Sequence, residues 1–205
     1  MIRNIVFDMG QVLIHWTPAL LIAHFHLTPE EETLLTREVF GNTEWVRLDH
    51  GTITEADAAE AICCRLPEKL HEPARTLVFD WWKRPLVPVE GMEELIRELK
   101  DLGYGIYLLS NASLRLREYF HRIPGSAYFD GLMVSAEQRI IKPQHAVFYR
   151  LLEDFSLNAG ECFFIDDSPA NVEGAMCVGI SGTVFHGDVS RLRRELREAG
   201  IPCKP

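Results

Sequence analysis

The sequence predicts an α/β fold: a Rossmann-like, doubly wound parallel sheet with an all-helical cap inserted after the first strand. Two observations support this prediction. Five short apolar runs alternate with helical patterns along much of the chain, as in parallel α/β domains. Between the first and second runs, residues 17–88 carry helical patterns and no convincing strand.

The five predicted strands are rich in β-branched and aromatic residues. They are NIVFD (4–8), GIYLLS (105–110), GLMVS (131–135), CFFID (162–166) and GTVFH (182–186). None shows a clean alternation of apolar and polar residues. This is typical of strands in a parallel sheet that is covered by helices on both faces.

Helical patterns separate the later strands. Residues 91–103 place five apolar side chains on one face, and Gly103 fits a C-terminal cap. These side chains are Met92, Leu95, Ile96, Leu99 and Leu102. A second pattern over 146–155 uses Val147, Leu151, Leu152 and Phe155, and SRLRRELREAG (190–200) gives a last helix.

The insert contains clear helix starts. Thr28, Pro29 and Glu31 form a capping box with proline at the first helical position, and Thr54 with Asp57 repeats the arrangement. Residues 73–82 predict a third helix, and the two prolines of 83–91 indicate a linker. We therefore expect a core of residues 1–16 and 87–205 and a helical cap of residues 17–86.

Some positions in the insert have less specific predictions. We expect Trp45, Trp81 and Trp82 to pack inside the helical bundle, and Cys63 and Cys64 to be packed thiols. The stretch VRLDHG (46–51) reads as a solvated loop, and Trp16, next to the predicted hinge, could belong to either part.

Composition and charge limit the class of protein. The 205 residues are 47% apolar and 25% charged, which is ordinary for a globular protein, and the formal net charge of -9 argues against a nucleic-acid partner. The chain has neither a membrane-length apolar run nor a signal-peptide pattern. Its five cysteines lack a C-x-x-C spacing and predict free thiols. We expect a cytoplasmic protein, away from membranes, that is a monomer or a weak homodimer.

Polar side chains follow three of the predicted strands. Asp8 follows the first, Ser110–Asn111 the second and Asp166–Asp167 the fourth, and the loop RIIKPQ adds Lys142. The carboxyl ends of adjacent parallel strands meet at one crevice, so we expect these side chains to lie together. Three acids at one point repel each other unless a cation is present, which predicts a Mg²⁺ site.

The remaining groups suit an anion. The hydroxyl of Ser110 and the amide of Asn111 precede a helical pattern, and Lys142 supplies a positive charge. A metal, a lysine and amide donors around a carboxylate predict phosphoryl transfer, with Asp8 as the nucleophile. By itself, Asp8 could simply cap a turn, and Ser110 with Asn111 could cap a helix.

Four segments together resemble the motifs of the haloacid dehalogenase-like hydrolase superfamily. They are FDMGQVL, LLSNA, IIKPQ and FFIDDSPANVEGA, and they occur in the order and at the spacing of that family. The resemblance implies Asp8 as the nucleophile, Ser110, Asn111 and Lys142 as phosphate ligands, and Asp166 and Asp167 on Mg²⁺. It also implies a small phosphorylated metabolite as substrate. The chain most resembles the bacterial branch that includes an α-glucose-1-phosphate phosphatase.

Gly10 departs from the usual pattern. Most phosphatases of the superfamily have a second Asp at this position, which protonates the leaving oxygen while its backbone carbonyl binds the metal. Gly10 keeps the carbonyl and loses the acid, and a positioned general acid contributes about 10²–10⁴-fold. The loss implies weak activity, an acid supplied from elsewhere, or a group that departs easily, and the last option suggests a sugar 1-phosphate. His15, Glu44 and His50 are candidates for a substitute acid.

Two other functions are weighed against the phosphatase. A 2-haloacid dehalogenase would need no metal, and the acid pair Asp166–Asp167 is then a liability. A non-catalytic module that binds a phosphorylated ligand is the alternative from another class. Asn171 is expected to brace the acidic loop through side-chain hydrogen bonds.

Overall fold

A computed structural model describes residues 1–204 and confirms the predicted fold class. The five-stranded parallel sheet has the order β5-β4-β1-β6-β7. The strands are β1 (Asn4–Phe7), β4 (Gly105–Ser110), β5 (Gly131–Val134), β6 (Cys162–Asp166) and β7 (Ser181–Val184). All five predicted strands are therefore present, with ends shifted by at most two residues.

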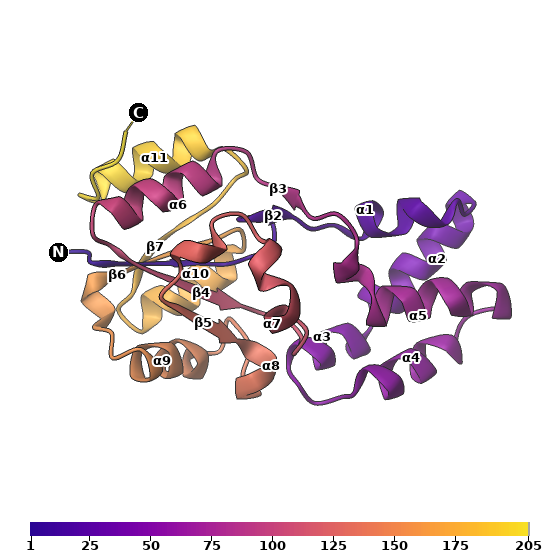
Figure 1. The fold of residues 1–205 in the computed structure, drawn as a ribbon. Coiled ribbons are helices and arrows are strands. Elements are labelled where there is room, and N and C mark those ends of the chain that lie inside the picture. Colours follow the sequence, from indigo (N-terminus) through magenta and orange to yellow (C-terminus); the bar gives the residue numbers. More distant parts are fainter. Residues whose placement is uncertain (205) are drawn as a thin grey trace.

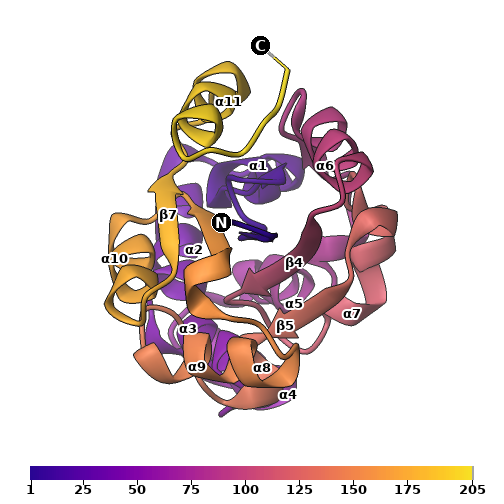
Figure 2. The same ribbon diagram turned by 90° about the vertical axis from the view of Figure 1, so that its left-hand side faces the viewer.

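Helices cover both faces of this sheet, as Figure 2 shows. On one face lie α6 (Met92–Asp101), α7 (Leu116–Tyr119) and α11 (Val189–Glu198), and on the other lie α9 (His145–Asp154) and α10 (Pro169–Cys177). Side chains of β1 alternate between the two layers, with Ile5 and Phe7 on the α6 side and Val6 on the α9 side. All three are fully buried, which explains the near-continuous apolar character of the strand.

The cap is a separate group of helices at the carboxyl edge of the sheet (Figure 1). It contains α1 (Pro18–Ile22), α2 (Pro29–Phe40), α3 (Thr43–Asp49), α4 (Glu55–Cys63) and α5 (His71–Phe79). Its helices bury a hydrophobic core of their own, with Leu35, Ile62 and Leu77 at the centre. The predicted capping box at Thr28 is present, and Thr54 caps α4 by accepting from the Asp57 N–H.

Two short strands join the cap to the core. β2 (Ile14–His15) and β3 (Val87–Pro88) pair in antiparallel fashion, so the chain leaves and re-enters the core side by side. The linker predicted at 83–91 therefore contains β3, which was not predicted because proline is unfavourable in most strands. Proline lacks the N–H of a central strand but is tolerated in a two-stranded edge pair.

The remaining elements are short. They are α8 (Ser135–Gln138) and the 3₁₀ turns Ala23–Phe25, Glu68–Leu70, Trp81–Lys83, Phe120–Arg122, Ser126–Tyr128 and Ala159–Glu161. No helix within residues 1–204 has the length and apolar character that a bilayer crossing requires. The five cysteines are free thiols, as predicted.

Three sequence predictions need correction. Residues 46–51 were expected to form a solvated loop, but Val46–Asp49 are the last residues of α3. Leu102 was expected on the buried face of α6, but it is half exposed because the helix ends at Asp101. The third cap helix begins at His71, and Trp81 lies in a following 3₁₀ turn.

Phe148 tests the packing of α9 on the sheet. Its ring is fully buried and makes an edge-on contact with Phe164 of β6, with ring centroids 5.6 Å apart. We expect Phe148→Ala to lower the free energy of unfolding by about 3–5 kcal/mol, because it leaves a cavity in the core. Tyr149→Ala, next to it on the exposed face, should change it by less than about 0.5 kcal/mol. Urea unfolding followed by tryptophan fluorescence measures both, and equal effects would contradict this packing.

Candidate active site

The predicted site residues meet at the carboxyl edge of the sheet. Asp8, Ser110 and Asp166 end or directly follow β1, β4 and β6, which are neighbours in the sheet. The Asp8 N–H continues the strand ladder by donating to the Ile165 carbonyl at 2.9 Å, which fixes the start of the loop. Lys142 reaches the same place from the loop between α8 and α9.

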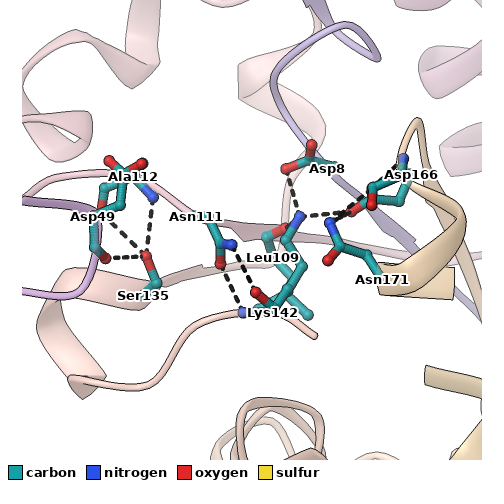
Figure 3. Close-up of polar contacts among 10 residues, drawn as sticks. Asp8, Asp49, Leu109, Asn111, Ala112, Ser135, Lys142, Asp166 and Asn171 are labelled. Atoms are coloured by element: carbon teal, nitrogen blue, oxygen red, sulfur yellow. Dashed lines mark hydrogen bonds and ion pairs between the residues drawn. The ribbon is translucent and has the colours of Figure 1, made fainter. Parts of the chain in front are cut away.

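Lys142 joins the first and fourth motifs in one buried ion cluster (Figure 3). Its Nζ lies 2.7 Å from Asp8 Oδ1 and 2.7 Å from Asp166 Oδ2, and it donates to the Leu109 carbonyl at 3.0 Å. These three acceptors use all three protons of the ammonium group. Lys142, Asp8 and Asp166 are each buried, so solvent screens this charge poorly.

The side chain of Asn111 holds the backbone of Lys142 through two hydrogen bonds. Its Nδ2 donates to the Lys142 carbonyl at 3.0 Å, and its Oδ1 accepts from the Lys142 N–H at 2.8 Å. Asn111 also lines the cavity over Asp8, and its role as a phosphate ligand stays a prediction. The expected helix start also lies further on, because α7 begins at Leu116.

Asp166 is fixed by donors on both of its oxygens. Asn171 Nδ2 lies 3.0 Å from Oδ1 and 3.1 Å from Oδ2, and the Ser168 N–H donates to Oδ1 at 2.8 Å. The bracing role predicted for Asn171 is therefore confirmed. Asp167, by contrast, is exposed at the mouth of the site.

The acidic cluster fits a hard divalent cation. Asp8, Asp166 and Asp167 each place a carboxylate oxygen within 4.8 Å of the others. One oxygen of Asp8 contacts Lys142 and the other points away from it (Figure 3). Oxygen-only donors of this kind suit Mg²⁺, which needs one or two carboxylates and retains several waters.

The same burial shifts the pKa values of these groups. Desolvation raises the pKa of Asp8 to about 6, Asp166 adds to the rise, and Lys142 opposes it. Desolvation and the nearby Asp166 also raise the pKa of Asp167. Burial alone would lower the pKa of Lys142, but the charges of Asp8 and Asp166 outweigh it and raise that pKa. Near neutral pH the lysine is therefore charged, and Asp8 is largely ionised.

A cavity of about 130 Å³ lies over Asp8, between the core and the cap. Most of its wall surface is apolar. The apolar and aromatic residues that line it are Met9, Trp16, Trp45, Leu48, Val78, Trp81, Ala112 and Tyr119. Trp16, Trp45 and Trp81 form one cluster, with ring centroids 5.6–6.5 Å apart. Trp45 and Trp81 were expected inside the bundle, but they line the site because the cap closes over the sheet edge.

None of the three expected substitute acids lines this cavity. His15 is exposed on β2, and His50 contacts the Arg139 carbonyl at 2.8 Å. Glu44 forms an ion pair with Arg65 at 2.8 Å, which lowers its pKa and keeps it ionised. The cavity instead contains Asp49 and Glu55 from the cap, which the sequence analysis missed. Neither belongs to a motif, so only the folded cap reveals them.

Comparisons with known proteins agree with this geometry. The haloacid dehalogenase-like hydrolase family matches residues 2–179 of the chain. A sesquiterpene phosphatase of Aspergillus oryzae, astK, is 29% identical over 86% of this chain and 86% of its own length. A drimenol cyclase of Aspergillus calidoustus, drtB, is 26% identical over 91% of this chain, which spans 34% of the cyclase.

A solved structure shares the fold over most of the chain. The haloacid dehalogenase-like family enzyme bt-2542 of Bacteroides thetaiotaomicron, in a magnesium complex, is 25% identical to this chain. The superposition covers 94% of this chain and 98% of that enzyme, with a TM-score of 0.67. The helical cap is part of the shared architecture.

The raised pKa of Asp8 predicts how metal binding depends on pH. Protons and a cation compete for the same carboxylate, so Mg²⁺ affinity should be nearly constant above about pH 7 and fall about tenfold per unit below about pH 6. Calorimetric titration with Mg²⁺ between about pH 5 and pH 8 measures this. Asp8→Asn should bind more weakly and lose the inflection near pH 6, and an affinity independent of pH would contradict the assignment.

Proposed function

This chain belongs to the haloacid dehalogenase-like hydrolase family, and on that premise we propose that it is a Mg²⁺-dependent phosphatase of a small phosphomonoester. The reaction proceeds through an aspartyl-phosphate on Asp8. The observation that carries the proposal is the buried cluster in which Lys142 lies 2.7 Å from both Asp8 and Asp166, beneath the cavity.

Each residue of the cluster has a role in this chemistry. A carboxylate oxygen of Asp8 attacks the phosphorus, and the bond from phosphorus to the organic oxygen breaks. Lys142 holds Asp8 in place and adds positive charge where the phosphoryl oxygens gather. Water then attacks the phosphorus of the Asp8 phosphate and releases inorganic phosphate. Asn111 and Ser110 complete the floor of the cavity.

Asp8, Asp167, Asp166 and the Gly10 carbonyl are the groups proposed to hold Mg²⁺. When bound, the ion supplies positive charge that offsets the repulsion between these acids and the phosphate. Asp167 is the proposed direct side-chain ligand, because both oxygens of Asp166 already accept hydrogen bonds. The magnesium complex of bt-2542 supports the choice of metal.

Replacing the nucleophile tests the reaction. We expect Asp8→Asn to lower kcat for p-nitrophenyl phosphate at least about 1,000-fold, because the amide cannot form the acyl phosphate. Asp101→Asn, an exposed aspartate at the end of α6, should leave kcat unchanged. The measurement is phosphate release with Mg²⁺ and with excess chelator. Full activity in Asp8→Asn, or in the absence of metal, would contradict the proposal.

The wall of the cavity also favours a class of substrate. We propose that the organic group of the ester is apolar, such as a short isoprenyl or aryl group. Three tryptophans, Leu48 and Val78 line the cavity, and their side chains offer mainly apolar contact to the organic group. The similarity to a sesquiterpene phosphatase supports this choice. A sugar 1-phosphate, suggested by Gly10, is the alternative.

A substrate series separates the two classes. Burying two methylene groups contributes about 1.6 kcal/mol, which is more than a tenfold effect. We therefore expect kcat/KM for dimethylallyl phosphate to exceed that for α-glucose 1-phosphate at least about tenfold. Geranyl and farnesyl phosphate extend the series and report how long a chain the cavity accepts. A preference for the sugar ester would overturn the apolar assignment and leave the phosphatase proposal intact.

A further inference from the structure

The cavity over Asp8 lacks a proton donor on the strand that carries the nucleophile. An alkoxide is a poor leaving group, so departure of an aliphatic alcohol needs a positioned acid. Gly10 offers no side chain, and a Cβ placed there would have no atom within 4 Å. Lys142 already donates its three protons to Asp8, Asp166 and Leu109.

Besides the nucleophile itself, two carboxyl groups line the cavity, and both come from the cap. Glu55 of α4 is tied to Arg115 of the core by three contacts of 2.6–3.0 Å. The Arg115 guanidinium therefore occupies both oxygens of the Glu55 carboxylate and orients them toward the core. Asp49, the last residue of α3, has no ion-pair partner among residues 1–204.

We propose that Asp49 is the general acid that protonates the leaving oxygen. This inference rests on the proposed phosphatase function. In the first step, Asp8 forms the bond to phosphorus and the leaving oxygen takes the Asp49 proton as its bond to phosphorus breaks. In the second step, Asp49 accepts a proton from the water that attacks the Asp8 phosphate, which restores the starting state.

The surroundings of Asp49 favour its protonated form. Burial, followed by the charge of Asp8, raises its pKa well above the usual range, while Lys142 opposes the rise. The other ionisable groups on this cavity are Tyr119 and the Glu55–Arg115 pair. Asp49 also ends α3, where the partial negative charge of the helix terminus disfavours a carboxylate.

Contacts with the core fix the position of Asp49 beside the loop that follows β4. Ser135 Oγ donates to the Asp49 carbonyl at 2.5 Å and accepts from the Ala112 N–H at 2.9 Å, as Figure 3 shows. The next two residues also dock: His50 Nε2 lies 2.8 Å from the Arg139 carbonyl, and Gly51 packs directly against the Ala136 backbone. Closure of the cap therefore brings a cap acid to a core nucleophile.

Three phosphate monoesters of similar size, two aryl and one benzylic, test the role. The alcohols released from p-nitrophenyl, phenyl and benzyl phosphate are decreasingly acidic in that order. Departure of the leaving oxygen therefore depends more strongly on protonation along the series. We expect Asp49→Asn to lower kcat/KM for benzyl phosphate about 10²–10⁴-fold and for p-nitrophenyl phosphate by less than about tenfold. The value of kcat/KM depends only on the steps up to departure of the alcohol, so a slow hydrolysis of the Asp8 phosphate does not mask the effect.

Two variants sharpen the comparison. Glu60→Gln, an exposed carboxylate of the same cap, should change none of the three rates. Because the space beside Gly10 is open, Gly10→Asp in the Asp49→Asn background should restore hydrolysis of benzyl phosphate. The Asn side chain leaves the Asp49 backbone carbonyl available to Ser135, so the cap still docks.

The outcomes distinguish the two proposals. An equal loss on all three esters, or no loss on benzyl phosphate, would overturn the role of Asp49 while hydrolysis by the wild-type protein still supports the phosphatase. Failure of the wild-type protein to release phosphate from p-nitrophenyl phosphate with Mg²⁺ would instead overturn the proposed function itself.

Discussion

The site depends on one buried ammonium group held between two carboxylates. Lys142 is 3% exposed and lies 2.7 Å from both Asp8 and Asp166. Without it, two acids at the ends of adjacent strands would repel each other in a medium that screens charge poorly. The Asn111 amide and the Asn171 side chain fix the two ends of this arrangement. The cluster is therefore rigid before any ligand arrives, which is how a site stabilises charge without reorganising.

The cap has the opposite character. It adds tryptophans, aliphatic side chains and Asp49 to a cavity whose floor is charged. Its own core is separate from that of the sheet, and only β2 and β3 connect the two parts covalently. Several contacts cross the junction, among them Glu55 with Arg115, Asp49 with Ser135, His50 with Arg139 and the Trp81 ring with Tyr119. A lid joined in this way can open for substrate and, on closing, exclude water and complete the site.

The strand pattern and the four motifs could be predicted from the sequence because their signals are local. Consecutive apolar residues indicate a buried parallel strand, and an acid at the end of that strand directly follows them in the sequence. The positions of Asp8 and Asp166 at the sheet edge could therefore be predicted without a structure. Asn171 was also assigned correctly, because five residues separate it from the acid that it braces. Trp45, Trp81 and Asp49 carry no such signal, and the chain around them reads as an ordinary amphipathic bundle.

The sequence alone therefore determined the α/β core, the helical insert and the residues that we propose for phosphoryl transfer. Only the tertiary structure decided what faces the nucleophile from above. Trp45 and Trp81, expected in the core of the bundle, line the cavity over Asp8, and so does Asp49. Glu44 does not line it and forms an ion pair with Arg65. The physical reason is that these positions depend on how two independently packed layers meet. That contact is set by a few long-range hydrogen bonds and close approaches, which no local periodicity encodes.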